Sequence, residues 1–235
     1  MHGGNIAIVG ASETTELGVI PNMSSQDLHV NAALNAIADS GLTLADIDGV
    51  ANDSFPPYEV SDLLGIRPRW VDGTGVGGCS YMLLVRHAAA AIAAGEASVV
   101  LISHGESGRS RVGSAPYSLD GASLSGQFEA PFGALAPYST FTLPVLAFLE
   151  SRGMSRRDLA EVVSAQRTWA ARNPRALKKT PVTVEEVLAE PTIAYPFSKD
   201  MCCVVTDGGG ALVLVSAARA RTAFGLARGV PPRVW

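Results

Sequence analysis

The segment GTGVGGCSYMLLVRHAAAAIAAGEASVVLISH, residues 73–104, decides the fold class of this chain. It opens with a glycine-rich turn over 73–78, which leads into an alanine-rich helical stretch over 79–94. The run ASVVLISH at 97–104 has the length and apolar character of a buried strand. Because the short strand WVD at 70–72 precedes the turn, the order strand, helix, strand indicates a unit of a parallel sheet.

The same alternation extends from this segment toward the N-terminus. Strands are expected over 5–9 and 47–52, and helices over 24–40 and about 60–64. The first of these helices is expected to turn apolar side chains inward at helical spacing: Leu28, Ala32, Leu34 and Ile37. The pattern predicts the α/β class, with a mostly parallel sheet and helices on its faces.

The alternation breaks after residue 104. The stretch 106–137 is rich in Gly, Ser, Ala and Pro and is too long for an ordinary connection, so we expect a functional loop or structure of its own. Further helices are expected at 138–152, 155–171 and 184–188, and a last strand from 201–206 and 210–215, with a glycine bulge at 208–210.

Composition excludes several classes of protein. The chain has 235 residues, of which 47% are hydrophobic and 17% charged, so it is not a disordered chain. Its formal charge of −4 argues against a nucleic-acid partner, and three cysteines favour a reducing, cytoplasmic location. We expect no signal peptide and no membrane span, because Arg86 and His87 interrupt the longest helix-like apolar run, 81–94.

Cys79 is the first candidate for chemistry, because it stands where a helix begins. The free N–H groups of a helix N-terminus lower the pKa of a thiol and stabilise an oxyanion. The alternative is a small buried cysteine that lets the helix approach the sheet. A dinucleotide fingerprint formed by Gly73, Gly75 and Gly78 is the weakest interpretation, because the turn follows the third strand rather than the first.

The loop HGESGRSRVG follows the fourth strand, where open α/β sheets bind their ligands. Arg109 and Arg111 are suited to hold a phosphate or a carboxylate. The alternative is a solvated loop pinned by ion pairs with Glu106 or Asp120. His104 is a candidate general base, against the commoner structural role of a histidine at a strand end.

The pair Cys202-Cys203 precedes the stretch TDGGGA at 206–211. Adjacent residues of a strand point to opposite faces, and neither cysteine has a CxxC partner or a nearby histidine. We therefore expect no metal site.

These segments together resemble the N-terminal half of a thiolase-superfamily protein. The likeness is nearest to the thiolase-like "lipid-transfer protein" branch related to sterol carrier protein X thiolase. It is carried by IAIVGASETTELG at 6–18, LTLADIDGV at 42–50, GGCSYMLLVRHAAAAIAAG at 77–95, HGESGRSRVG at 104–113, NPRA at 173–176 and CCVVTDGGGALVLVSAARAR at 202–221.

The resemblance implies a thiolase-like half with the order βαβαβαββ. This half is a mixed, mostly parallel five-stranded sheet with helices on both faces. It implies one N-terminal domain over 1–216, in which the loop insertion 106–150 covers the acyl-CoA site. Residues 217–235 are expected to be a tail, the truncated start of a missing C-terminal domain.

The resemblance also implies the processing of acyl-CoA, of the acetyl-CoA acetyltransferase or β-ketoacyl-CoA thiolase type. Cys79 is then the nucleophile, although an ungapped match puts Gly78 in its place. His104 is a weaker catalytic candidate, and Gly78, Ser80, Arg109 and Arg111 are expected to contact the substrate. No metal or cofactor is expected besides the CoA thioester itself.

The family pattern leaves an alternative function open. Thiolase chemistry takes an activating histidine in a GHP-type motif and a second cysteine in a CxG motif from a second half. This chain has histidines only at positions 2, 29, 87 and 104. The alternative is a non-catalytic half-thiolase, or a retro-aldolase subunit that needs an OB-fold partner chain for chemistry on steroid or lipid CoA thioesters. A homodimer is expected, because relatives dimerise through this half.

Overall fold

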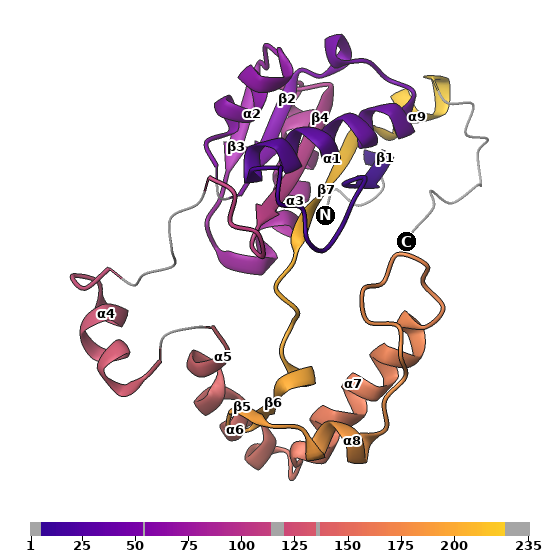
Figure 1. Cartoon of the computed structure of the whole chain (residues 1–235). Helices are drawn as coiled ribbons and strands as arrows, with labels where there is room; N and C mark the ends of the chain where they lie inside the picture. The colour runs from indigo at the N-terminus through magenta and orange to yellow at the C-terminus, as the bar shows by residue number, and fades with distance from the viewer. Residues whose placement is uncertain (1–5, 54, 114–119, 135–136, 224–235) are drawn as a thin grey trace. The chain divides into compact units, whose positions relative to one another are not determined.

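The computed structural model describes residues 6–53, 55–113, 120–134 and 137–223 (Figure 1). The chain divides into two compact units. The first takes in residues 1–114 and 206–235, and the second takes in residues 115–205.

The first unit is built on a five-stranded sheet with the order β1-β7-β4-β2-β3. Its strands are β1 (Ile6–Glu13), β2 (Gly49–Asn52), β3 (Trp70–Gly73), β4 (Val99–Ser107) and β7 (Asp207–Ser216). Strand β2 pairs in parallel with β3 and β4, whereas β7 runs antiparallel to both β1 and β4. Four strands of this sheet therefore share one direction, which confirms the predicted mixed, mostly parallel arrangement.

Helices cover both faces of this sheet, as predicted. Helices α1 (Ser25–Ser40), α2 (Pro57–Leu64) and α9 (Ala217–Ala223) share one apolar core with inward side chains such as Leu101. Helix α3 (Ser80–Ala94) packs on the other face, against residues such as Val100 and Ile102. Helix α9 takes up the first part of the predicted tail, and residues 224–235 lie outside the described chain.

Helix α1 begins and ends as its sequence predicts. Ser24 and Asp27 form a capping box at its start, and Gly41 takes the left-handed conformation at its end. Its buried stripe differs from the prediction at one position, because Leu34 is 44% exposed whereas the polar His29 is completely buried. The stripe follows residues 28/29, 32/33 and 36/37, and residue 34 lies outside that spacing.

The predicted start of the last strand is wrong. Residues Lys199–Met201 form a 3-10 turn, and β7 begins only at Asp207. The reason is the length of the neighbouring strand: β4 ends at Ser107, which pairs with Asp207, so no neighbour of the main sheet faces the residues before it.

The predicted glycine bulge is also wrong. The β4–β7 register is continuous, and the register shift lies in β1, between Ile8 and Gly10. Gly209 instead allows the backbones of β7 and β4 to lie close together, because a Cβ there would lie 2.1 Å from the carbonyl oxygen of His104.

The second unit is mainly helical, so the predicted loop region contains structure of its own. Its elements are α4 (Leu124–Phe128), α5 (Pro137–Thr140), α6 (Thr142–Ser151), α7 (Arg156–Ala170), α8 (Val184–Ala189), β5 (Thr192–Ala194) and β6 (Phe197–Ser198). The single helix predicted over 138–152 is therefore two helices. Helix α7 begins with the predicted capping box of Ser155 and Asp158. This unit also contains a 3-10 turn at Ala130–Phe132, whereas the 3-10 turns at Leu44–Asp46 and Gly77–Cys79 belong to the first unit.

In the described chain no single helix is long and apolar enough to cross a membrane. One sharply bent pair, Leu124–Phe132 with Pro137–Ser151, would pass by length and composition alone.

Candidate functional site

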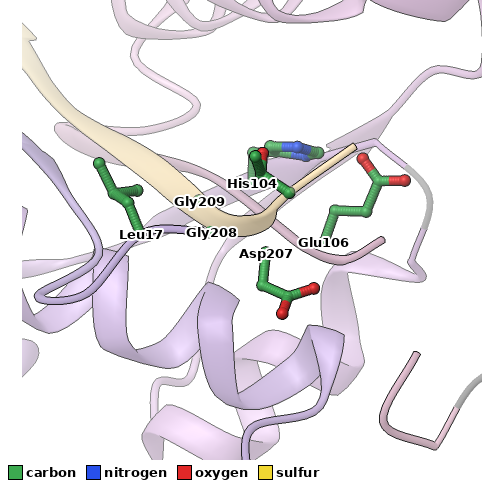
Figure 2. A pocket seen from close by; sticks show the side chains of 7 residues that line it. Leu17, His104, Glu106, Asp207, Gly208 and Gly209 are labelled. Carbon is green, nitrogen blue, oxygen red and sulfur yellow. The ribbon is translucent and has the colours of Figure 1, made fainter. Parts of the chain in front are cut away.

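The candidate site lies at the edge of the sheet where β2, β3 and β4 end and α3 begins. Parallel strands collect their carboxyl ends at one edge, and open α/β sheets bind ligands there. A pocket of about 260 Å³ opens at the end of β4 (Figure 2). It is lined by Leu17, His104, Glu106, Thr206, Asp207, Gly208 and Gly209. Figure 2 shows the His104 ring and the Glu106 carboxylate on one side of the strands, with the Asp207 carboxylate pointing the other way.

Tyr81 and His104 form the hydrogen-bonded pair of this edge. The phenol oxygen of Tyr81, in the first turn of α3, lies 2.5 Å from Nδ1 of His104. Burial raises the pKa of Tyr81, with the charges of Asp53 and Glu106 adding to the effect. Burial lowers the pKa of His104, although Glu106 and Asp53 oppose that shift. A protonated phenol can donate to Nδ1 of a neutral imidazole, and in that arrangement the imidazole proton lies on Nε2.

Asp207 organises the turn that follows β4. Its buried carboxylate accepts hydrogen bonds from the backbone N–H groups of Ile20 at 2.7 Å, Arg109 at 2.7 Å and Ser110 at 2.8 Å. The Ser110 hydroxyl adds a fourth bond at 2.5 Å. Desolvation alone raises the pKa of Asp207, but these hydrogen bonds outweigh it and hold the pKa below its ordinary value. One buried charge therefore joins the start of β7, the arginine-bearing loop and the segment before α1.

The three neighbours at the start of α3 differ in exposure. Cys79 lies in the 3-10 turn before the helix, and its exposed thiol contacts the carbonyl oxygen of Val76 at 3.6 Å. The alternative of a buried packing cysteine is therefore wrong. Gly78 faces open space, since a Cβ there would meet nothing within 4 Å. Ser80 is completely buried, and its hydroxyl has no hydrogen-bond partner in the described chain.

Arg109 and Arg111 lie on the loop that Asp207 holds. Both are exposed, and Arg111 takes a left-handed φ of 56° while its N–H donates to the Ser107 carbonyl at 2.8 Å. Within the described residues of the first unit no ion pair joins either guanidinium to Glu106, and Asp120 belongs to the second unit. The loop is pinned through its backbone by Asp207 rather than by its arginines, which leaves both guanidinium groups directed to solvent.

Known proteins share this architecture along most of the chain. No family model matches it. The chain is 32% identical over 232 residues to the 17-hydroxy-3-oxo-4-pregnene-20-carboxyl-CoA lyase of Mycobacterium tuberculosis, covering 94% of this chain and 60% of that protein. The solved structure of an "Ltp2-ChsH2(DUF35) aldolase" superposes with a TM-score of 0.85 at 30% identity, over 94% of this chain and 58% of the other. A monomeric SCP2-thiolase-like protein of Mycobacterium smegmatis superposes with a TM-score of 0.71 at 27% identity, over 97% and 48%.

The chain is similar over most of its length to thiolase-superfamily proteins, and we call it a half-domain because it spans only part of theirs. This confirms the family resemblance and the fold drawn from the sequence. The half-domain spans 60% of the length of the curated relative and about half to three-fifths of the two solved chains.

The half-domain also holds a functional candidate that the sequence interpretation missed, His29 on α1. It is completely buried, and its Nδ1 lies 3.0 Å from the hydroxyl of Ser103 on β4. Its ring meets Phe55 edge-on, with 5.5 Å between centroids, and the His104 ring at 6.0 Å. Burial first, then the charge of His104, lowers the pKa of His29 to about 4. Helical spacing is the signal that locates it, because His29 falls within the buried stripe of α1.

No metal centre is found in the part of the half-domain that the structure describes. No group of three or more His, Cys, Asp or Glu side chains comes together there. Cys202 and Cys203 are free thiols outside any strand, and burial together with Cys203 raises the pKa of Cys202.

Proposed function

We propose that this half-domain processes acyl-CoA thioesters at the edge formed by α3 and β4, and that its reaction is carbon–carbon bond cleavage of the retro-aldol type. The observation that carries the proposal is the pocket-lining His104, whose Nδ1 lies 2.5 Å from the hydroxyl oxygen of Tyr81. A neutral imidazole with its proton on Nε2 offers a hydrogen bond to a developing oxyanion. The lyase relative, whose name includes a carboxyl-CoA thioester, supports the same chemistry.

The reaction balances without any further co-reactant. In a substrate with a hydroxyl on the carbon next to the α-carbon of the thioester, a base removes the hydroxyl proton. The bond between these two carbons then breaks, which leaves a ketone and the enolate of a shorter acyl-CoA. Protonation of the α-carbon completes the products. Catalysis consists of holding the thioester oxygen while it carries negative charge, and no cofactor besides the CoA thioester is proposed.

The roles of the site residues follow from their positions. Arg109 and Arg111 are proposed to bind the phosphates of CoA, because both are exposed cations on a loop with a fixed backbone. Gly78 and Ser80 are proposed to lie beside the thioester at the start of α3. No side chain caps this helix start in the described chain, and the Ser80 N–H bonds the Gly77 carbonyl. The N–H groups that follow Ser80 are therefore proposed to stabilise an oxyanion.

A second candidate function is acyl transfer of the thiolase type with Cys79 as nucleophile. Its support is the exposure of the thiol directly before α3. The retro-aldol reaction is preferred because the described contact of the Cys79 sulfur is a carbonyl oxygen, which cannot accept the thiol proton as a catalytic base does.

The assembly is proposed from the relatives and the family pattern. The name of the "Ltp2-ChsH2(DUF35) aldolase" couples an aldolase with a DUF35 protein, and this supports a partner chain for the present half-domain. That the partner is of the OB-fold type is proposed from the family resemblance alone. A homodimer and a cytoplasmic location are further parts of the proposal. Light scattering of the purified chain tests the dimer, and a monomer at micromolar concentration would contradict it.

The reaction is tested with two thioesters, a tertiary β-hydroxyacyl-CoA and acetoacetyl-CoA. The purified chain is assayed alone and with a DUF35 protein, and products are identified by mass spectrometry. Retro-aldol cleavage yields a ketone and a shorter acyl-CoA without added CoA, whereas thiolytic cleavage requires free CoA as second substrate. We expect the first result, unchanged in Cys79→Ser and at least about tenfold slower in Tyr81→Phe. Failure of calorimetry to detect binding of any CoA thioester would reject both candidates.

A further inference from the structure

A buried polar cluster lies at the carboxyl end of the sheet, and we define it as His29, Asn52 and Ser103. All three side chains are completely buried. Asn52 ends β2 and is the register partner of Ser103 on β4, so the two residues are direct neighbours across the strands. Both share the α1 face of the sheet, because side chains alternate and Val50 and Leu101, two residues earlier in each strand, face the α1 core.

The cluster contains more polar atoms than its own hydrogen bonds satisfy. His29 Nδ1 bonds the Ser103 hydroxyl at 3.0 Å. His29 Nε2 and both polar atoms of the Asn52 amide have no hydrogen-bond partner in the described chain. A buried polar atom left unpaired costs about 1–3 kcal/mol, and such atoms are nearly always paired in folded proteins.

The chemistry of these atoms defines what would pair with them. Asn52 offers a donor and an acceptor, and Nε2 of a neutral imidazole offers one or the other according to tautomer. The cluster itself carries no charged member, because burial holds the pKa of His29 at about 4 and Asn52 and Ser103 are neutral groups. A fully buried ion would be costly there, so the matching ligand is small, neutral and able both to donate and to accept.

We propose that His29 and Asn52 form an internal water site. One ordered water bonds Nε2 of His29 and the side-chain amide of Asn52, and thereby links α1 to β2. Ser103 extends the link to β4, and the ring of Phe55 covers His29 from the side. Buried waters of this kind make about three hydrogen bonds and act as part of the fold. The site holds the end of β4 immediately before His104.

A crystal structure of the full chain, at a resolution that orders internal water, tests the site directly. We expect density within hydrogen-bond distance of both His29 Nε2 and the Asn52 amide. A direct hydrogen bond between the two side chains, or no density between them, overturns the proposal.

A double-mutant cycle provides the energetic test. Asn52→Leu and His29→Phe each remove one side of the site, so each is expected to lower Tm by about 2–10 °C. The double variant is expected to lose clearly less than the sum, because either change alone already removes the water. His87→Phe, on the exposed face of α3, is the matched control and should shift Tm little. Additive losses would overturn the proposal, and Asn52→Leu with its crystal structure remains decisive if His29→Phe does not fold.

Discussion

The hydroxyl of Tyr81 lies 2.5 Å from Nδ1 of His104, so the first turn of α3 is bonded directly to the end of β4. These residues are 23 positions apart in the chain and belong to different elements. The raised pKa of Tyr81 and the lowered pKa of His104 favour a protonated phenol beside a neutral imidazole. With Tyr81 as the donor, the proposed arrangement has the His104 proton on Nε2.

Tyr81→Phe is expected to raise the pKa of His104 toward its ordinary value of 6.5. Loss of the donated hydrogen bond removes an interaction that favours the neutral ring. Proton–nitrogen NMR titration measures the change and also tests the Nε2–H tautomer in the unmodified protein. Tyr58→Phe, on the exposed face of α2, is the control. A His104 titration that is identical in wild type and Tyr81→Phe would contradict this prediction.

The buried His29 is expected to make stability depend on pH. Its pKa is about 4 in the folded state and 6.5 when unfolded. Between these values the unfolded chain binds more protons, so stability rises with pH in this range and is lost as pH falls through it. The full window corresponds to roughly 3 kcal/mol. Urea unfolding at several pH values should show a shallower dependence in His29→Phe, and equal slopes for variant and wild type would refute the assignment.

Asp207→Asn is expected to destabilise the protein by about 1–3 kcal/mol, because an amide cannot accept all four hydrogen bonds as a carboxylate does. Hydrogen exchange should accelerate at the amides of Arg109 and Ser110. The control is Asp62→Asn, since Asp62 is exposed on α2. The low pKa of Asp207 means that its contribution is present above the unfolded pKa near 3.8 and is lost in more acidic solution. Unchanged exchange in the loop would show that Asp207 does not hold it.

Gly105→Ala is expected to destabilise the fold by about 1–3 kcal/mol or more. The added Cβ would lie 2.3 Å from the backbone nitrogen of His29 and 2.6 Å from the carbonyl oxygen of Ser25, so α1 would have to move away from β4. Gly75→Ala is the control, because a Cβ there meets nothing within 4 Å. Thermal unfolding of both variants measures the difference, and similar Tm values would contradict the close approach of α1 and β4.

Arg109→Ala and Arg111→Ala are each expected to weaken CoA binding by about tenfold, in line with the loss of a charge-assisted hydrogen bond. The effect should shrink as salt is added, because both side chains are exposed. Calorimetry at two ionic strengths measures it, with Arg86→Ala on α3 as control. Equal affinity in all three variants would remove the loop from the proposed CoA site.

Patterns of residues close together in the chain predicted most of the helices and strands. Apolar runs and helix caps predicted β1 to β4, α1, α3 and α7, because strand burial and capping boxes depend on residues close together in the chain. The end of β7 was also predicted, but its start was not, since that boundary depends on where β4 ends. The exposure of Leu34 likewise follows from which side of α1 the sheet covers.

The sequence by itself determined the fold class and the family resemblance, and it predicted the edge of the sheet at which we propose the site. Only the tertiary structure decided which side chains meet there. Tyr81 and His104 meet because α3 packs against β4. Asp207 reaches Ile20 because the segment at Gly18 pairs with the start of β7. Asn52 and Ser103 are neighbours because of strand register, and His29 reaches Ser103 because α1 packs on that face of the sheet. Such contacts join distant parts of the chain, and a local pattern of residues contains no information about which distant partner will be adjacent.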